Sequence, residues 1–377
     1  MKYYIIAGEA SGDLHASNLM KELKKLDADA HFRCWGGDRM SEQGGVLVKH
    51  YRDLAFMGFI EVLINIRTIL RNMNFCKKDI LQYKPHALIL VDYPGFNLEI
   101  AQFAHKNNLR VYYYISPQVW AWKSSRVKLI KKVVHKMFVI LPFEKEFYAR
   151  FNYEVLFVGH PLLDAVNRNE ICLDKMAFIR KYTLLDKRIV ALLPGSRLQE
   201  IKKILPVMLK SMALYSEYQL IVCAVGTIDI EIYKNLCRNY NVKIVVNDTY
   251  NVLNNAHAAL VTSGTATLET ALFGVAQVVC YYANYFSYII AKNLIKLKYI
   301  SLVNLILDKN VLAELIQKDL NTERIRKEFE KISEDTTQRK ALLDDYNELK
   351  EKLGGKGASE RTATYIFKEM SERLHEI

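Results

Sequence analysis

The sequence lacks the features that mark secreted, zinc-stabilised or membrane-spanning proteins. Its six cysteines form no Cys-x-x-Cys pair, which argues against a structural zinc site or a disulfide framework and fits a reducing compartment. No apolar run reaches the roughly 18–20 residues that a spanning helix needs. Residues 1–7 lead directly into an expected strand, without the apolar core and cleavage site of a signal peptide. We therefore expect a cytoplasmic protein that is soluble or peripheral to a membrane.

Two common nucleotide signatures and an excess of acid are missing as well. The chain has neither G-x-G-x-x-G nor G-x-x-x-x-G-K-[ST], and the absence of the second excludes an ATP-hydrolysing P-loop. There are 41 acidic side chains against 53 Lys and Arg, so the formal charge is +12. Such a charge indicates an anionic partner: nucleic acid, acidic lipid or a phosphorylated substrate. Because the positive charges are interleaved with apolar helix and form no nucleic-acid motif, we expect no nucleic-acid partner.

Short apolar strands alternate with helical stretches along the chain. A length of 377 residues exceeds a single typical core, so two domains are expected. We predict an α/β fold with two Rossmann-like parallel-sheet domains, residues 1–165 and 166–345, and a final helix at 358–377 that packs back on the first. The expected strands lie at 3–7, 86–91, 110–115, 137–141 and 155–158 in the first half and at 189–193, 219–225, 242–246 and 258–262 in the second.

A turn suited to phosphate follows the first strand of the second half. Gly195 and Ser196 lie between the end of this strand and the start of a helix, where backbone N–H groups and the helix dipole favour an anion. Arg197 adds a guanidinium that can engage two phosphate oxygens. The alternative is an ordinary strand-to-helix turn with a solvated arginine.

A second turn of this kind follows the strand expected at 258–262. It contains Ser263, Gly264 and Thr265 and again starts a helix. Glu269, one turn into that helix, could accept hydrogen bonds from ribose hydroxyls, and Asn304 would lie nearby if the sheet closes normally. Two such turns in one half indicate a nucleotide-diphosphate site more strongly than either does alone.

Polar residues also follow strands of the first half. Glu9 and Ser11 lie in the turn after the first strand, and Asp92 directly follows another. Doubly wound sheets hold ligands at these strand ends, although Asp92 could instead cap the next helix, and the first turn could simply be solvated. Gln118 and Trp120 add a polar and an aromatic group at the end of a further strand.

Residues 56–75 predict a helix that is apolar around most of its circumference. Arg67 and Arg71 interrupt it, as basic residues do in helices that lie at a membrane interface. The alternative is a deeply buried helix. In the interfacial interpretation, the membrane-facing residues are Ile60, Val62, Leu63, Ile66, Ile69 and Leu70.

Six motifs, taken together and in this order, resemble the lipid-A-disaccharide synthase family. The resemblance covers the chain from residue 4 to about residue 320. The motifs are Gly8-Glu-Ala-Ser-Gly-Asp13, Met57-Gly-Phe-Ile-Glu-Val62, Asp92-x-Pro-x-Phe-Asn97, Ser116-Pro-Gln-Val-Trp-Ala-Trp122, Leu193-Pro-Gly-Ser-Arg197 and Ser263-Gly-Thr-Ala-x-x-Glu269.

The resemblance implies the GT-B architecture, in which two Rossmann-like domains face a central cleft, and an inverting glycosyl transfer. The implied substrates are UDP-2,3-diacylglucosamine and 2,3-diacylglucosamine 1-phosphate, and the products are a β(1→6) disaccharide 1-phosphate and UDP. This displacement needs a base for the acceptor hydroxyl and positive charge or dipoles for the leaving diphosphate. Neither a metal nor another cofactor is expected.

The resemblance also implies roles for the residues noted above. Asp92 is expected to be the base, with an ordinary pKa of about 3.9, and Glu9 is the competing base or a residue that orients sugar hydroxyls. Ser11, Asn97, Gln118 and Trp120 are expected on the acceptor side. The expected UDP-sugar-binding residues are Gly195, Ser196, Arg197, Ser263, Gly264, Thr265, Glu269 and Asn304.

Acylated substrates imply a peripheral enzyme on the anionic inner membrane of a Gram-negative bacterium. The helix at 56–75 would then be the docking face. The oligomeric state is left open between a monomer and a homodimer. A UDP-sugar epimerase of the same architecture is the alternative, although it would not need this apolar surface.

Overall fold

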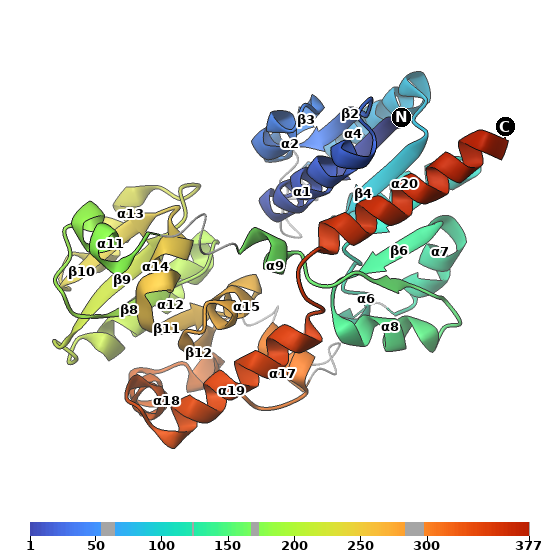
Figure 1. The fold of residues 1–377 in the computed structure, drawn as a ribbon. Coiled ribbons are helices and arrows are strands. Elements are labelled where there is room, and N and C mark those ends of the chain that lie inside the picture. Colours follow the sequence, from blue (N-terminus) through green and yellow to red (C-terminus); the bar gives the residue numbers. More distant parts are fainter. Residues whose placement is uncertain (54–64, 123, 167–172, 283–297, 377) are drawn as a thin grey trace. The chain divides into compact units, whose positions relative to one another are not determined.

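The computed structural model describes residues 1–53, 65–122, 124–166, 173–282 and 298–376. The chain divides into two compact units: unit 1 comprises Met1–Asp164 with Leu353–Ile377, and unit 2 comprises Ala165–Lys352. Each unit contains one sheet in which all strand pairs are parallel, covered by helices on both faces (Figure 1). The predicted α/β fold with two Rossmann-like parallel-sheet domains is therefore confirmed.

Unit 1 is built on a seven-stranded sheet in the order β3-β2-β1-β4-β5-β6-β7. The chain therefore builds the sheet outward from β1 in one direction and from β4 in the other, so strand order reverses between these two neighbours. The strands are β1 (Lys2–Ala7), β2 (His31–Gly36), β3 (Val46–His50), β4 (Ala87–Val91), β5 (Val111–Tyr114), β6 (Lys136–Val139) and β7 (Leu156–Phe157).

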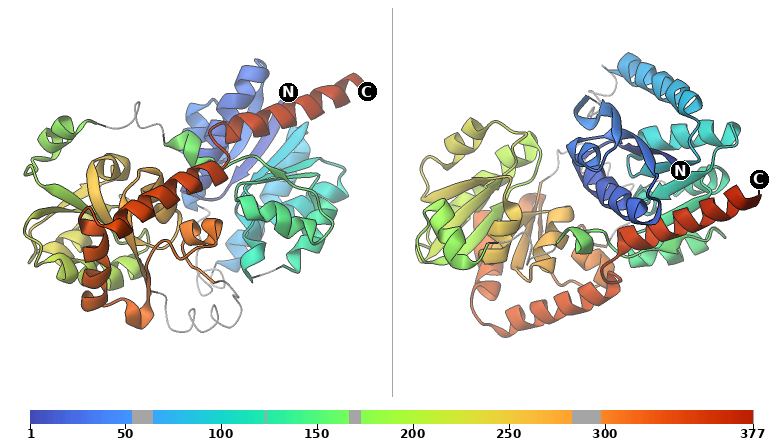
Figure 2. Two further views of the ribbon diagram at one scale, coloured as in Figure 1. Left: turned by 60° about the horizontal axis from the view of Figure 1, so that its bottom comes forward. Right: turned by 45° about the horizontal axis from the view of Figure 1, so that its top comes forward.

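Helices cover both faces of this sheet, and the alternation of side chains along each strand defines two cores. One face packs against α1 and α20, and the other against α4, α5 and α7 (Figure 2). Tyr112 and Tyr114 of β5 lie in the first core, whereas Tyr113 lies in the second. The helices of unit 1 are α1 (Ala10–Leu26), α2 (Asp38–Glu42), α4 (Ile66–Tyr83), α5 (Pro94–Lys106), α6 (Val119–Trp122), α7 (Arg126–Val133), α8 (Pro142–Ala149), α9 (Leu162–Ala165) and α20 (Ala358–Glu376), with the 3-10 turn η1 (Tyr51–Asp53).

A partly buried ion pair fixes α4 on the sheet. Asp79 of α4 accepts two hydrogen bonds from the Arg33 guanidinium of β2, at 2.8 and 2.6 Å, and a third of 2.7 Å from the Tyr4 hydroxyl of β1. The Trp35 indole in turn donates to the Tyr4 hydroxyl at 2.8 Å. Because a buried charge is tolerated when it is paired and hydrogen-bonded, this network sets which face of α4 is buried and which is exposed.

Unit 2 is built on a six-stranded sheet in the order β10-β9-β8-β11-β12-β13, with the reversal between β8 and β11. Its strands are β8 (Arg188–Leu193), β9 (Tyr218–Ala224), β10 (Val242–Val246), β11 (Ala256–Thr262), β12 (Ala276–Tyr281) and β13 (Glu314–Ile316). Its helices are α11 (Lys175–Tyr182), α12 (Leu198–Met212), α13 (Ile230–Cys237), α14 (Thr249–Asn255), α15 (Thr265–Leu272), α17 (Leu302–Leu307), α18 (Thr322–Ser333) and α19 (Thr337–Lys352), with the 3-10 turn η2 (Gln317–Asp319).

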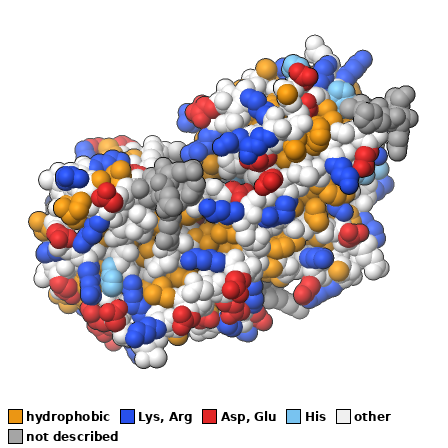
Figure 3. All heavy atoms as spheres, in the orientation of Figure 1, with side chains coloured by type: hydrophobic (Ala, Val, Ile, Leu, Met, Phe, Trp, Pro, Cys, Tyr) orange, Lys and Arg blue, Asp and Glu red, His pale blue; other side chains and the backbone are white. Residues whose placement is uncertain are grey.

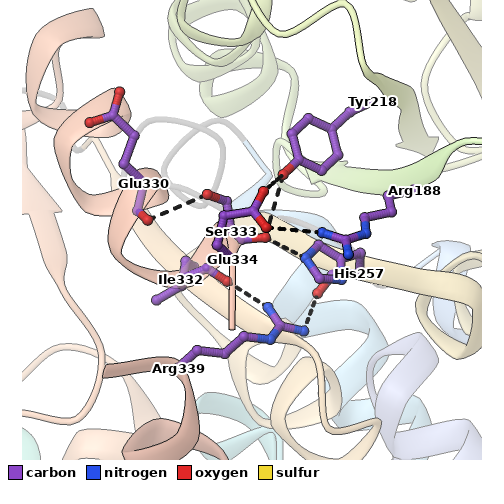
Figure 4. A network of polar contacts seen from close by, with 8 residues as sticks. All are labelled: Arg188, Tyr218, His257, Glu330, Ile332, Ser333, Glu334 and Arg339. Carbon is purple, nitrogen blue, oxygen red and sulfur yellow. Dashed lines mark hydrogen bonds and ion pairs between the residues drawn. The ribbon is translucent and has the colours of Figure 1, made fainter. Parts of the chain in front are cut away.

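A polar network joins the α18–α19 connection to the amino ends of unit 2 strands (Figure 4). His257 of β11 hydrogen-bonds to the Ser333 carbonyl at 2.6 Å, and the Arg339 guanidinium donates to the His257 carbonyl at 2.9 Å. Arg188, the first residue of β8, pairs with Glu334 at 3.2 Å. These contacts fix the edge of the sheet opposite to the predicted phosphate turns.

The surface carries charge of both signs. On the face drawn in Figure 3, Lys and Arg side chains are spread among Asp and Glu side chains. No helix within the described ranges is long and apolar enough to cross a lipid bilayer.

The return of the chain into unit 1 depends on side chains that bind backbone groups. The Asp164 carboxylate accepts hydrogen bonds from the backbone N–H groups of Gly357 (2.6 Å) and Ser359 (3.1 Å), at the start of α20. The Arg361 guanidinium donates to the Val158 carbonyl at 2.9 Å. Since the amino end of a helix has unpaired N–H groups and a positive dipole, the Asp164 carboxylate stabilises the docked α20.

We predict that Asp164→Ala loosens α20. Loss of a carboxylate cap costs about 0.5–2 kcal/mol of stability, so the urea midpoint should fall and proteolysis at residues 353–357 should accelerate. The matched control is Asp174→Ala, which removes the cap at the start of α11, where Asp174 accepts from Ala177 N at 2.8 Å. Mass spectrometry of the fragments checks the site of cleavage. Equal cleavage at 353–357 in the two variants would contradict the prediction.

Candidate active site

Both predicted phosphate turns lie at the point where strand order reverses in unit 2. Strands β8 and β11 are parallel neighbours, with Leu193 opposite Val261. The turns that follow them therefore emerge side by side at the carboxyl edge of the sheet and lead into α12 and α15. In open α/β sheets this is the position where ligands bind.

The first turn requires glycine at position 195. Gly195 has φ +105°, and a Cβ built there would lie 2.5 Å from Glu200 Oε2. Ser196 is exposed, and Arg197 is the N-cap residue of α12. The Arg197 side chain is 69% exposed and forms a single ion pair, with Glu200 at 3.6 Å, within the described part of the chain. Most of its donors are therefore accessible to an anion.

The second turn has the same character. Gly264 has φ +142° and is the N-cap residue of α15, and Thr265 is the exposed first residue of that helix. The Ser263 hydroxyl donates to the Ile300 carbonyl at 3.3 Å. The Thr262 hydroxyl is buried at the end of β11 and has no hydrogen-bond partner among the described residues. Two helix starts with hydroxyl side chains thus lie at one strand-order reversal.

Glu269 and Asn304 differ in how many hydrogen bonds their side chains already form within the protein. Glu269 accepts a 2.9 Å hydrogen bond from the Tyr250 hydroxyl, and burial raises its pKa. The Asn304 amide donates to the Leu312 carbonyl and to Glu314, both at 2.9 Å, and its oxygen accepts from the N–H groups of Val311 and Leu312. Because both amide donors and the amide oxygen of Asn304 serve the protein itself, we leave this residue out of the proposed site.

In unit 1, Glu9 and Asp92 follow the two strands between which strand order reverses. Ala7 at the end of β1 is opposite Val91 at the end of β4, so both carboxylates lie at one edge of the sheet. The pKa of Asp92 is raised to about 6, first by burial and second by the negative charge of Glu9, and a hydrogen bond from the Tyr93 backbone opposes the rise. The expectation of an ordinary aspartate is therefore corrected, because a nearby carboxylate and burial disfavour the ionised form.

The backbone at Asp92 has an unusual conformation. Asp92 and Tyr93 both lie in the left-handed region, with φ +45° and +48°. The Tyr93 ring packs on Gly8, where a Cβ would lie 2.3 Å from the ring. Consecutive non-glycine residues in this region are strained, and such strain is concentrated at functional sites.

The residues predicted on the acceptor side fall into two groups. Ser11, in the first turn of α1, and Gln118 are exposed. Trp120 is half-buried, and its ring packs edge-on against Phe143 at 4.9 Å between ring centroids. Asn97 is fully buried, and its amide donates to the Asp92 carbonyl at 2.8 Å. Asn97 thus supports the backbone of the site instead of facing solvent.

Sequence reasoning missed two buried polar residues beside these elements. The Tyr113 hydroxyl donates to the Asp92 carbonyl at 2.6 Å. The Glu144 carboxylate accepts from the backbone N–H groups of Ile140 (3.1 Å) and Leu141 (2.9 Å) at the start of α8, and burial raises its pKa to about 7. A Pro-x-Glu start of a helix could have indicated the second, whereas nothing in a run of three tyrosines distinguishes the first.

The predicted membrane-facing helix is described in part. Ile60, Val62 and Leu63 lie outside the described residues. In α4, Ile66 is 44% and Leu70 is 55% exposed, whereas Ile69 is half-buried. The neighbouring Arg67 and Arg71 side chains are also exposed. The outer face of α4 therefore presents apolar and basic side chains together.

Comparisons with known proteins show the family of the chain. A model of the lipid-A-disaccharide synthetase family matches residues 3–367. The lipid-A-disaccharide synthase of Syntrophus aciditrophicus is 41% identical over 370 residues, 95% of each chain. That of Geobacter sulfurreducens is 36% identical over 377 residues, 98% of this chain and 97% of the relative.

Solved structures show the same fold at low identity. The UDP-GlcNAc 2-epimerase of Neisseria meningitidis, bound to UDP-GlcNAc, superposes with a TM-score of 0.69 at 12% identity, covering 98% of this chain and 100% of that one. The glycosyltransferase of kitacinnamycin superposes with a TM-score of 0.67 at 13% identity, covering 98% and 99%. At such identities the match shows the GT-B fold and leaves transferase and epimerase undistinguished. The family match and the relatives make that distinction: the chain belongs to the lipid-A-disaccharide synthase family.

Proposed function

We propose that the protein transfers 2,3-diacylglucosamine from UDP-2,3-diacylglucosamine to the 6-hydroxyl of 2,3-diacylglucosamine 1-phosphate. The products are the β(1→6) disaccharide 1-phosphate and UDP. Family membership supports this reaction. The observation that carries it is that the family's motif residues flank the strand-order reversal in each unit, phosphate-type turns in unit 2 and two carboxylates in unit 1.

In this proposal, unit 2 binds the UDP part of the donor. The turns at Gly195–Arg197 and Ser263–Thr265 direct the amino ends of two helices toward the same edge, where partial positive charge favours an anion. The guanidinium of Arg197 adds a full charge. As the bond between the sugar and the diphosphate breaks, negative charge grows on the departing oxygen, and these groups stabilise it. Glu269 is proposed to accept from the ribose hydroxyls.

Unit 1 supplies the base. The oxygen of the acceptor's 6-hydroxyl attacks the anomeric carbon, the electron pair of the broken bond leaves with UDP, and the hydroxyl proton goes to Asp92. A carboxylate with a pKa of about 6 is largely ionised at neutral pH, and it holds a proton more strongly than an ordinary aspartate does. Glu9 is proposed to orient sugar hydroxyls and to raise the proton affinity of Asp92 by its charge.

The acyl chains of both substrates call for a lipid surface. The exposed apolar side chains Ile66 and Leu70 lie on α4 beside the exposed Arg67 and Arg71. Apolar side chains enter the headgroup boundary, and arginines attract anionic lipid. We therefore propose that the protein is peripheral on the anionic inner membrane and that the outer face of α4 contacts it.

The proposed base is tested by Asp92→Asn and Glu9→Gln. We expect Asp92→Asn to lower kcat by about 10²–10⁴, the range attributed to general base catalysis, while calorimetry shows unchanged UDP binding. Glu9→Gln should lower kcat less. If Glu9→Gln instead costs more turnover than Asp92→Asn, the base is Glu9. Conversion of the UDP-sugar into an epimer that retains UDP, without any lipid acceptor, would favour an epimerase.

The pH dependence of kcat/KM provides a second test. Since the base must be ionised, kcat/KM, which reports the free enzyme, should fall as pH decreases through about 6, the pKa of Asp92. Glu9→Gln removes a negative neighbour, so the pKa of Asp92 should drop and the acidic limb should move to lower pH. A limb that stays in place in Glu9→Gln would contradict the proposed coupling of the two carboxylates.

Membrane docking is tested by the double variant Ile66→Ser, Leu70→Ser. Both side chains are exposed, so the fold should persist while binding to anionic vesicles decreases in a flotation assay. The matched control is Leu185→Ser with Leu214→Ser, two exposed leucines of unit 2, which should bind vesicles as the parent does. Unchanged vesicle binding of the α4 variant, or its unfolding, would count against the proposal.

A further inference from the structure

Strand β5 contains three consecutive buried tyrosines whose hydroxyls contact different parts of unit 1. The Tyr112 hydroxyl donates to Met370 Sδ at 3.3 Å, and the Tyr114 hydroxyl lies 3.4 Å from the Ser359 hydroxyl. Both contacts are with α20. Tyr113 points to the opposite face, where its hydroxyl donates to the Asp92 carbonyl at 2.6 Å. One hydroxyl of the three therefore contacts the proposed base residue.

The Asp92 carbonyl receives a second hydrogen bond from an equally buried donor. The Asn97 amide donates to it at 2.8 Å, and both Asn97 and Tyr113 are fully buried. The Asp92 N–H still pairs with the Tyr114 carbonyl at 3.1 Å. The main chain is thus held on the amide side by the ladder to β5 and on the carbonyl side by two side chains.

This attachment lies where the backbone is strained. Asp92 and Tyr93 are both left-handed, a conformation that persists in non-glycine residues only when the surroundings hold it. A shift of Asp92 would break both hydrogen bonds to its carbonyl, and only the Asn97 amide has other carbonyl partners, those of Ile6 at 3.4 Å and Val91 at 3.3 Å.

The same conformation also sets the position of Glu9. The Tyr93 ring stacks on Phe96, with 5.6 Å between ring centroids and 28° between the planes. The ring also packs against Gly8, where even a Cβ would come within 2.3 Å of the ring. Since Gly8 directly precedes Glu9, a shift of Tyr93 would move the turn that carries the second carboxylate.

We propose that Tyr113 is a positioning residue for the transfer reaction: its hydroxyl, together with the Asn97 amide, holds the Asp92 carbonyl and so directs the Asp92 carboxylate and the adjoining Glu9 turn toward the acceptor. This inference rests on the proposed function, because it concerns what holds the proposed base in position. Tyr113 is fully buried and acts on the reaction through the position of Asp92.

The test is Tyr113→Phe, which removes one hydroxyl and keeps the ring. We expect kcat to fall on the order of tenfold to a hundredfold, as for a misplacement of a reacting group by about 1 Å, with KM and UDP binding unchanged. The control is Tyr114→Phe, which deletes a buried hydroxyl from the next residue of the same strand and should keep the parent's kcat. Thermal unfolding of both variants separates lost stability from lost positioning.

The pH profile gives a readout that a purely structural role would not move. Glu9 and the Tyr93 backbone N–H act on the pKa of Asp92, and Asp92, Tyr148, the Asn97 side chain and Arg126 act on the pKa of Tyr113. If Tyr113→Phe lets Asp92 relax toward solvent, burial raises its pKa less, and the acidic limb of kcat/KM should move to lower pH. A limb at the parent's position, with the parent's kcat, would overturn the inference.

The remaining outcomes are also decisive. An equal loss of kcat in Tyr114→Phe would reduce the effect to general destabilisation and overturn the inference. If Tyr113→Phe does not fold, Asn97→Leu removes the other donor, together with an amide oxygen that has no partner among the described residues, and should show the same loss of kcat. Should Asp92→Asn retain turnover, the proposed role of Asp92 as the base fails; if Asp92→Asn loses turnover and Tyr113→Phe keeps the parent's kcat, only this inference fails.

Discussion

Parallel strand pairing is the constraint on which the rest of this structure depends. It places the carboxyl end of every strand at one edge of its sheet, and where strand order reverses, the two neighbouring turns lead to helices on opposite sides. In unit 1 the reversal lies between β1 and β4, and in unit 2 between β8 and β11. Glu9 with Asp92, and the Gly195 turn with the Gly264 turn, are therefore neighbours although about 80 and 70 residues separate them in the sequence.

Several buried or half-buried carboxylates among the described residues serve helix starts. Asp13 accepts from the N–H groups of Gly37 and Met40 at α2, Glu144 from Leu141 at α8, and Glu314 from Ser301 at α17. Asp164 does the same for α20. These contacts satisfy donors that a helix cannot pair internally. A carboxylate that caps a helix and one that acts as a general base are the same residue type and lie at similar positions after a strand. Composition and spacing alone therefore do not distinguish the two roles.

The sequence predicts much of the fold and the chemistry of its turns. Apolar runs such as 189–193 and 258–262 mark buried parallel strands, and Gly-Ser or Ser-Gly after them marks the turns, because both signals are local. The hydrogen bonding of Asn304 could not be predicted in this way. Its side chain forms four hydrogen bonds with residues in the range 311–314, and these depend on how that segment packs. The role of Tyr113 could not be predicted for a similar reason. Side chains alternate between the two faces along β5, so a one-residue shift in register would place a different tyrosine on the face of Asp92.

Asp92 illustrates the conflict between stability and chemistry. Raising its pKa from 3.8 to about 6 means that the ionised form costs the folded state on the order of 3 kcal/mol. The cost is absent below the unfolded pKa, where the group is protonated in both states, and complete above the folded value. It is accompanied by two left-handed residues, a second source of strain. A carboxylate that only caps a helix would need neither. Its negative charge stabilises the folded state, whereas the negative charge of Asp92 destabilises it. The buried Tyr113 hydroxyl and Asn97 amide, which donate to the Asp92 carbonyl, oppose relaxation of this strained arrangement. The stability of the rest of unit 1 offsets its free-energy cost.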